Sequence, residues 1–95
     1  MSATSGTAPG ANRSPPLAVM IVDDELFART RLRTLVQACA EPRCVVAGEA
    51  ADGASALDRI NRLRPDVVFM DIQMPEMTGL EVLRRLDYLP EIVFT

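Results

Sequence analysis

The chain of 95 residues contains neither lysine nor histidine, so all ten of its basic residues are arginine. Without histidine, and with only two cysteines, it cannot build the Cys/His type of metal site that zinc prefers. Its 13 acidic residues bring the net charge to −3, which gives no electrostatic signature of nucleic-acid binding. We therefore expect that this segment binds no nucleic acid.

Long hydrophobic runs are also missing. The first apolar run, residues 17–22, is followed by three acids, whereas a membrane-spanning helix needs about 20 apolar residues. The same run is too short for a secretory signal. We expect no membrane association and a cytoplasmic location. Cys39 and Cys44 are then expected to be small core residues of a reduced protein.

The composition nevertheless predicts a folded chain, because 48% of the residues are hydrophobic. Residues 1–16 are small, polar and rich in Pro, Gly, Ser and Thr, and they predict a disordered leader. Residues 17–95 are expected to form one small domain.

Apolar segments alternate with helical patterns along this domain. Strands are predicted at 17–22, 44–50, 67–70 and 92–95. The apolar faces of three helices are predicted at Ala28, Leu32, Leu35, Val36 and Cys39, then at Ala54, Leu57, Ile60 and Leu63, then at Leu80, Leu83 and Leu86. The continuous apolar strand at 67–70 is expected to be buried on both faces. This alternation predicts an α/β fold, a doubly wound parallel sheet with right-handed crossovers.

Three carboxylates follow two of these strands. Asp23 and Asp24 come directly after the first strand, and Asp71 comes after the third. In a flavodoxin-like strand order these two strands are neighbours, so the carboxylates converge at the carboxyl edge of the sheet. That much like charge is unfavourable without a cation, and oxygen ligands without His or Cys point to Mg²⁺.

Each of these residues also has a purely structural interpretation. Asp24 could cap the first helix, and Asp71 could form an Asx-turn. Thr95 could be an ordinary strand residue. Glu25 and Arg29 are spaced as an i,i+4 ion pair of that first helix.

Four motifs of the chain occur in a known order and spacing: IVDDE at 21–25, ADG at 51–53, PDVVFMDIQMPEMTGLEVL at 65–83 and IVFT at 92–95. Through these motifs the chain resembles, from residue 17 to residue 95, the receiver domain of bacterial two-component response regulators. The chain looks most like the LytTR-type regulators, whose receiver precedes a DNA-binding domain. The segments that look most like them are DDELFARTRLRTLV at 23–36 and FMDIQMPEMTGLEVL at 69–83. The resemblance implies a CheY-like fold.

The resemblance also implies a role for each site residue. Asp71 would accept a phosphoryl group from a phosphohistidine of a sensor histidine kinase. Asp24 and Asp71 would bind Mg²⁺ directly, together with the backbone carbonyl of Gln73, and Asp23 would act through a metal-bound water. Thr95 would be the switch hydroxyl that reports phosphorylation.

The chain departs from the family's pattern at its C-terminal end. The family has five βα units, whereas this sequence stops at the fourth strand, before the family's active-site lysine and any output domain. We expect slower or less complete phosphorylation than in a full receiver. With the fourth strand as an open edge, we also expect a partly dynamic monomer or self-association through that strand.

Two other functions compete with the phosphoacceptor interpretation. Haloacid-dehalogenase-type phosphatases also use an aspartate at a strand end, but they need a second acid where this chain has Gln73, and they need a lysine. We therefore expect no enzyme. The remaining alternative is a truncated or degenerate receiver that only binds a kinase.

Overall fold

The structure, a computed structural model, describes residues 15–95, so the predicted leader lies outside the described residues except for Pro15 and Pro16. Four strands and three helices alternate along this part of the chain. In order they are β2 (Leu17–Val22), α1 (Leu26–Gln37), β3 (Cys44–Ala50), α2 (Gly53–Leu63), β4 (Val67–Met70), α3 (Gly79–Arg85) and β5 (Glu91–Phe94). The predicted strands agree with these bounds to within one residue.

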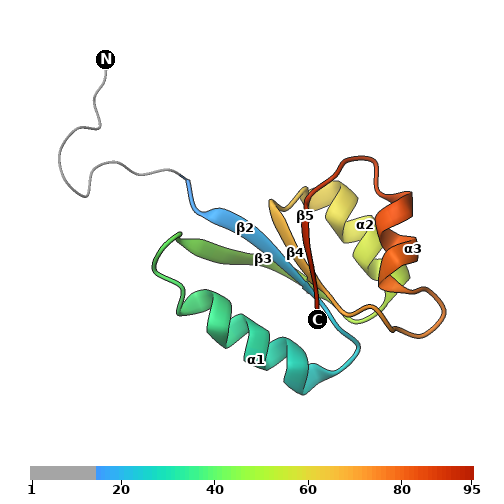
Figure 1. The fold of residues 1–95 in the computed structure, drawn as a ribbon, viewed down its shortest axis with the longest axis horizontal. Helices are drawn as coiled ribbons and strands as arrows, with labels where there is room; N and C mark the ends of the chain where they lie inside the picture. The colour runs from blue at the N-terminus through green and yellow to red at the C-terminus, as the bar shows by residue number, and fades with distance from the viewer. Residues whose placement is uncertain (1–14) are drawn as a thin grey trace, which may run out of the picture.

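The four strands form one parallel sheet in the order β3-β2-β4-β5. Counted along the chain this order is second, first, third, fourth, as the flavodoxin-like prediction requires. Figure 1 shows α1 on one face of the sheet and α2 with α3 on the other. The predicted doubly wound α/β fold is therefore confirmed.

The larger hydrophobic core lies between the sheet and the pair α2 and α3. Its buried members come from three strands, both helices and the loop after β4: Met20, Val22, Ala50, Ala56, Ile60, Val68, Met70, Met74 and Val82. Side chains on alternate residues of β2 and β4 point into this core, as the period of a strand requires. This cluster has nine buried members, whereas the cluster on the opposite face has three.

Both helices of this layer begin at a capped residue. The Asp52 carboxylate accepts a hydrogen bond of 2.8 Å from the backbone N–H of Ser55, and this bond holds the pKa of Asp52 below its ordinary value. The Thr78 hydroxyl accepts one of 3.2 Å from the N–H of Glu81. Each cap satisfies an N–H that has no partner within its helix.

The opposite face, which α1 covers, is less completely packed. Its buried residues are Val19 and Ile21 of β2 and Val36 of α1. Val67 and Phe69 of β4 are only half-buried there, so the prediction that this strand is buried on both faces is wrong for the α1 face. The reason is that α1 is the one described helix on that face, and it leaves an open apolar pocket of about 290 Å³ against the sheet.

Two residues of the predicted α1 face are exposed instead. The helix ends at Gln37, so Cys39 lies beyond it and is exposed, which contradicts its predicted place in the core. Leu35 is 62% exposed. Successive residues of a helix are about 100° apart, so the turn that buries Val36 carries Leu35 toward solvent.

The predicted face of α3 is also wrong in part. Leu80 is 51% exposed, whereas Val82, which the apolar pattern did not single out, is fully buried at 0%. Val82 and Leu86 are spaced four residues apart and pack together onto the α2 side of the sheet. A helix of seven residues is too short for its apolar spacing alone to define the buried side.

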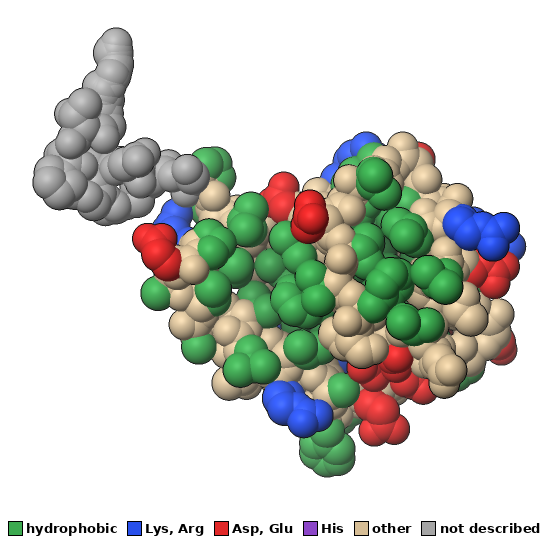
Figure 2. All heavy atoms as spheres, viewed as in Figure 1, with side chains coloured by type: hydrophobic (Ala, Val, Ile, Leu, Met, Phe, Trp, Pro, Cys, Tyr) green, Lys and Arg blue, Asp and Glu red, His purple; other side chains and the backbone are tan. Residues whose placement is uncertain are grey.

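The strand β5 forms one edge of the described sheet. Val93 on this strand is exposed. Figure 2, which views the molecule from the β5 side, shows hydrophobic side chains gathered over this edge and between α1 and the sheet. An open apolar edge is the feature that favours strand pairing between chains, so self-association through this strand stays a prediction.

Paired substitutions on α3 test which side of this helix is buried. We expect Val82→Ala to lower the free energy of unfolding by about 2 kcal/mol, because two buried methyl groups are replaced by a cavity. Leu80→Ala should change it by less than about 0.5 kcal/mol, as exposed positions usually do. Urea unfolding followed by circular dichroism measures both values. A larger loss for Leu80→Ala than for Val82→Ala would contradict the observed orientation.

Candidate functional site

Backbone hydrogen bonding continues one residue past three of the strands and brings their ends to one edge of the sheet. Asp23 N–H donates to the Ala50 carbonyl at 3.1 Å, Asp71 N–H to the Val22 carbonyl at 2.9 Å, and Thr95 N–H to the Met70 carbonyl at 2.9 Å. The register that pairs Val22 with Met70, and Met70 with Phe94, therefore places Asp23, Asp71 and Thr95 at neighbouring positions.

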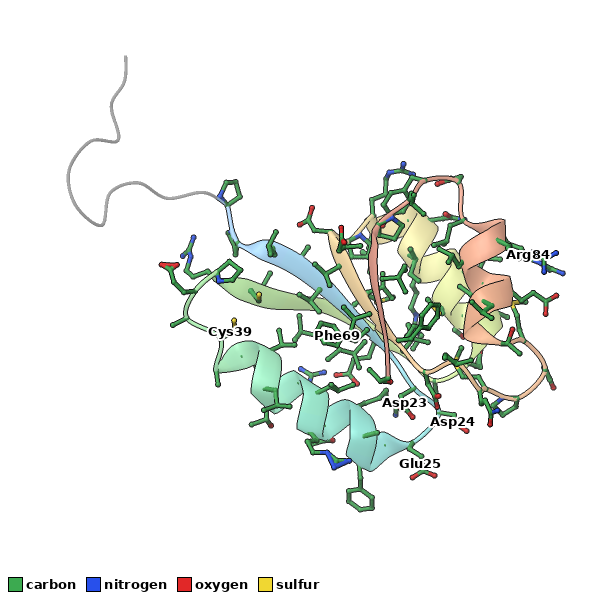
Figure 3. All side chains as sticks on the ribbon, in the orientation of Figure 1. Asp23, Asp24, Glu25, Cys39, Phe69 and Arg84 are labelled. Carbon is green, nitrogen blue, oxygen red and sulfur yellow. The ribbon has the colours of Figure 1, made fainter. Side chains whose placement is uncertain are left out.

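The three predicted carboxylates do converge at this edge. One carboxylate oxygen from each of Asp23, Asp24 and Asp71 lies within 4.8 Å of the others. Asp23 is the most enclosed at 8% exposed, Asp71 is half-buried and Asp24 is exposed. Figure 3 shows Asp23 and Asp24 where β2 runs into α1, and Figure 2 shows acidic side chains gathered on the surface there.

Local turns orient two of these carboxylates. Asp23 Oδ1 accepts a hydrogen bond of 2.9 Å from Glu25 N–H, and Asp71 Oδ1 accepts one of 3.1 Å from Gln73 N–H. The Asx-turn considered for Asp71 is thus present, and it holds the carboxylate at the strand end. The interpretation of Asp24 as the cap of α1 is wrong. Glu25 occupies the N-cap position, and its side chain makes no cap hydrogen bond. In the turn before the helix, it is the Asp23 carboxylate that accepts the Glu25 N–H.

The loop after Asp71 folds back onto β4. Gly79 N–H donates to the Ile72 carbonyl at 2.7 Å, which closes the loop at the start of α3. A Cβ on Gly79 would come within 2.7 Å of the Asp71 carbonyl oxygen, so this close approach requires glycine. Gln73 therefore lies two residues beyond Asp71 in a closed turn, and Thr95 is exposed directly after β5. The predicted roles of both residues stay predictions.

Arg29 of α1 contributes to the site in a way that the sequence pattern did not predict. Its guanidinium donates to the backbone carbonyl of Asp23 at 2.8 Å and lies 3.3 Å from the carboxylate of Glu49 on β3. Arg33 also pairs with Glu49. The prediction that Arg29 pairs with Glu25 is wrong. Helical spacing identifies neighbours within α1, but it does not identify partners on the strand beneath the helix. These contacts fasten the start of α1 beside the acidic cluster.

The composition of the acidic cluster limits what it can bind. Its side-chain ligands are carboxylate oxygens alone, which suit a hard cation of the Mg²⁺ or Ca²⁺ class rather than zinc or copper. The donor set therefore fits the Mg²⁺ site predicted from the sequence. A carboxylate at a strand end is also a nucleophile of the type that forms covalent intermediates in ATPases.

Comparison with known families identifies the fold that carries this cluster. The family described as response regulator receiver domain matches residues 19–94, nearly the whole described part of the chain. The chain belongs to this family. The receiver-domain resemblance predicted from the motifs is therefore confirmed.

Curated relatives of this receiver domain are longer proteins. The transcriptional regulatory protein BtsR of Salmonella typhi is 45% identical over 80 residues, which cover 82% of this chain and 33% of that protein. A protein-glutamate methylesterase/protein-glutamine glutaminase of Myxococcus xanthus is 45% identical over 74 residues, which cover 78% of this chain and 20% of that protein. The chain thus spans a third or less of the length of these relatives.

Solved receiver structures agree with the fold. The response regulator domain of Thermotoga maritima CheB superposes with a TM-score of 0.77 at 32% identity, covering 84% of this chain and 60% of that one. CheY6 of R. sphaeroides, solved in complex with the P1 domain of CheA3, superposes with a TM-score of 0.70 at 33% identity, covering 85% and 64%. Within residues 15–95 of this receiver domain, no helix has the length and apolar character that crossing a membrane requires.

The Arg29 contacts lead to a prediction with a control on the same helix. We expect Arg29→Met to lower the free energy of unfolding by about 1–3 kcal/mol, because the enclosed Asp23 carbonyl loses its charged donor. The side chain of Arg29 is only 16% exposed. Arg31→Met, at an exposed position of α1, should change stability by less than about 0.5 kcal/mol. Equal effects of the two substitutions in urea unfolding would contradict the positioning role of Arg29.

Mutual repulsion among the carboxylates leads to a second prediction. Asp24 is the best residue to neutralise, because it is exposed and its neighbours Asp23 and Asp71 are the ones that hold the local turns. We expect Asp24→Asn to raise the free energy of unfolding by roughly 1 kcal/mol in buffer containing a chelator. The gain should shrink in high salt, which screens exposed charges. A loss of stability at low salt would show that the cluster is not strained by repulsion.

Proposed function

We propose that this receiver domain is a phosphoacceptor, in which Asp71 takes a phosphoryl group from a phosphohistidine of a sensor histidine kinase. The observation that carries the proposal is the position of Asp71. Its carboxylate lies at the carboxyl end of a central parallel strand, within 4.8 Å of two further carboxylates. Open α/β sheets bind their ligands at this edge, where the strand order reverses. Family membership supports the same residue, because the family match spans it.

The chemistry asked of Asp71 is one displacement at phosphorus. A carboxylate oxygen forms the new P–O bond while the P–N bond to the histidine ring breaks, and the ring nitrogen keeps the electron pair. The Gln73 N–H fixes Asp71 Oδ1 and so limits the rotation of the attacking group. The chain itself would turn over no substrate, since the phosphoryl group remains on it as the signal.

Asp24, Asp71 and the Gln73 backbone carbonyl are proposed to hold Mg²⁺ directly, with Asp23 acting through a water. Bound there, the ion would shield the negative charges of the carboxylate and the phosphoryl oxygens from one another. Asp23 keeps its orientation through Glu25 N–H, and its backbone through Arg29. Thr95 is proposed as the switch hydroxyl, because strand pairing sets it next to Asp71.

The proposed partner is a histidine kinase. A solved relative at 33% identity, CheY6, was captured with the P1 domain of CheA3. The start of α1 and the acidic cluster lie together at one surface of this chain, as Figure 3 shows for Asp24 and Glu25. A docked phosphohistidine would therefore reach Asp71 from that side.

For the whole protein we propose a LytTR-type transcription regulator. The sequences of residues 23–36 and 69–83, which look like those of LytTR-type regulators, support it, as does the 45% identity to the transcriptional regulatory protein BtsR. A methylesterase relative of equal identity shows that similar receivers also occur in proteins with other activities.

A second candidate is a receiver that binds a kinase without accepting the phosphoryl group. The charges beside the acidic cluster favour it. Arg29 donates a hydrogen bond to the Asp23 carbonyl, but its charge is already paired with Glu49, so it is not free to neutralise a phosphoryl group.

Intact mass separates these two functions. We expect purified chain, incubated with Mg²⁺ and phosphoramidate, to gain the mass of one phosphoryl group. Phosphoramidate is a suitable donor because it carries the same P–N bond as phosphohistidine. Asp71→Asn should abolish the gain, whereas Asp58→Asn, on the exposed side of α2, should retain it.

Chelation of Mg²⁺ provides the metal control, and it should slow the gain of mass in the unaltered chain. Uptake that persists in Asp71→Asn would place the acceptor elsewhere. No uptake by a chain that circular dichroism shows to be folded, together with binding to a kinase, would support the second candidate.

A further inference from the structure

The two cysteines lie together at the end of the sheet that is remote from the acidic cluster. Cys39 follows the end of α1 by two residues, and Cys44 begins β3, with four residues between them. Both side chains line the apolar pocket between α1 and the sheet. Figure 3 shows the Cys39 sulfur in the space between the end of α1 and the start of β3. Both thiols are free.

The two cysteine side chains also lie near each other at this pocket. The Cys44 thiol donates a hydrogen bond of 3.5 Å to the Pro42 carbonyl. Burial above all, then the proximity of Cys39, raises the pKa of the Cys44 thiol. The loop from 39 to 44 thus brings both cysteine side chains to the same apolar pocket.

The surroundings of the two sulfur atoms differ in a way that suits stepwise oxidation. Cys39 is exposed, so it meets a dissolved oxidant first. Cys44 is half-buried and lines the same pocket as Cys39, so it is placed to attack a modified Cys39 from the protein side. An accessible cysteine beside a second one is the usual arrangement of a reversible thiol pair.

We propose that Cys39 and Cys44 form a reversible intramolecular disulfide that links the end of α1 to the start of β3. The oxidant is a low-molecular-weight disulfide of the glutathione class. The Cys39 thiolate attacks one sulfur of the oxidant, forms a mixed disulfide and releases one thiol. The Cys44 thiolate then attacks the Cys39 sulfur and releases the second thiol. Two protein thiols are oxidised, and one disulfide is reduced to two thiols.

The position of this link determines what it would change. Val36 is the only buried residue of α1, so the helix is held to the sheet by little buried surface. The disulfide would fasten the C-terminal end of α1, at the mouth of the pocket. The opposite end of α1 is already fastened by Arg29 and Glu49. The link therefore restrains the helix without touching the acidic residues.

A glutathione redox titration tests the proposal. The reduced chain is equilibrated with increasing ratios of oxidised to reduced glutathione, alkylated and weighed by intact mass. We expect both thiols to disappear in one step, with a mass lower by two hydrogen atoms, no retained glutathione and no dependence on protein concentration. The folded chain should form this disulfide roughly tenfold or more readily than the same chain unfolded in urea.

Single-cysteine variants provide the matched controls. Cys44→Ser should accumulate the mixed disulfide at Cys39, and Cys39→Ser should keep Cys44 as a free thiol while the chain is folded. Mixed disulfides or linked dimers in place of the intramolecular product would overturn the proposal. So would equal oxidation in the folded and unfolded chain, because the fold would then contribute nothing beyond short sequence separation.

Discussion

The parallel pairing of β2 with β4 is the interaction on which both the sheet and the acidic site depend. It joins the β3-β2 half of the sheet to the β4-β5 half. The same register ends in the bond from Asp71 N–H to the Val22 carbonyl, which sets Asp71 beside Asp23. A slip of one residue would turn the apolar side chains of a strand to the opposite face and separate the carboxylates. Core and site are therefore specified by one register.

The two faces of this sheet contribute unequally to stability. On one face α2 and α3 enclose a core that includes Met20, Val68 and Met70, all fully buried. On the other, α1 buries little beyond Val36 and leaves Phe69 half-buried beside an open pocket. The start of α1 is held mainly by charge pairing with Glu49 rather than by apolar contact. Side-chain burial holds α2 and α3 against the sheet, whereas polar contacts at the first turns of α1 position that helix.

The sequence predicted those features that local patterns determine. Apolar runs gave the four strands, and the acids that follow them gave the site, because parallel strands bring their carboxyl ends to one edge. The errors concern which residues meet across the fold. Leu80 was predicted in the core in place of Val82, because spacing within one short helix does not show where the sheet lies. The partner of Arg29 is 20 residues away, on another element. Cys39 was expected inside a helix that ends two residues earlier.

The electrostatics of the site explain why a cation belongs in the proposed function. Three carboxylates approach within 4.8 Å, and the described donors to them are the N–H groups of Glu25 and Gln73. Backbone dipoles orient such groups but carry only partial charge. Arg29 offers a full positive charge nearby, yet it is directed to Glu49 and to a backbone carbonyl. The net negative charge of the cluster is thus left to be balanced from solution, and a hard divalent cation does so with the ligands that this edge presents.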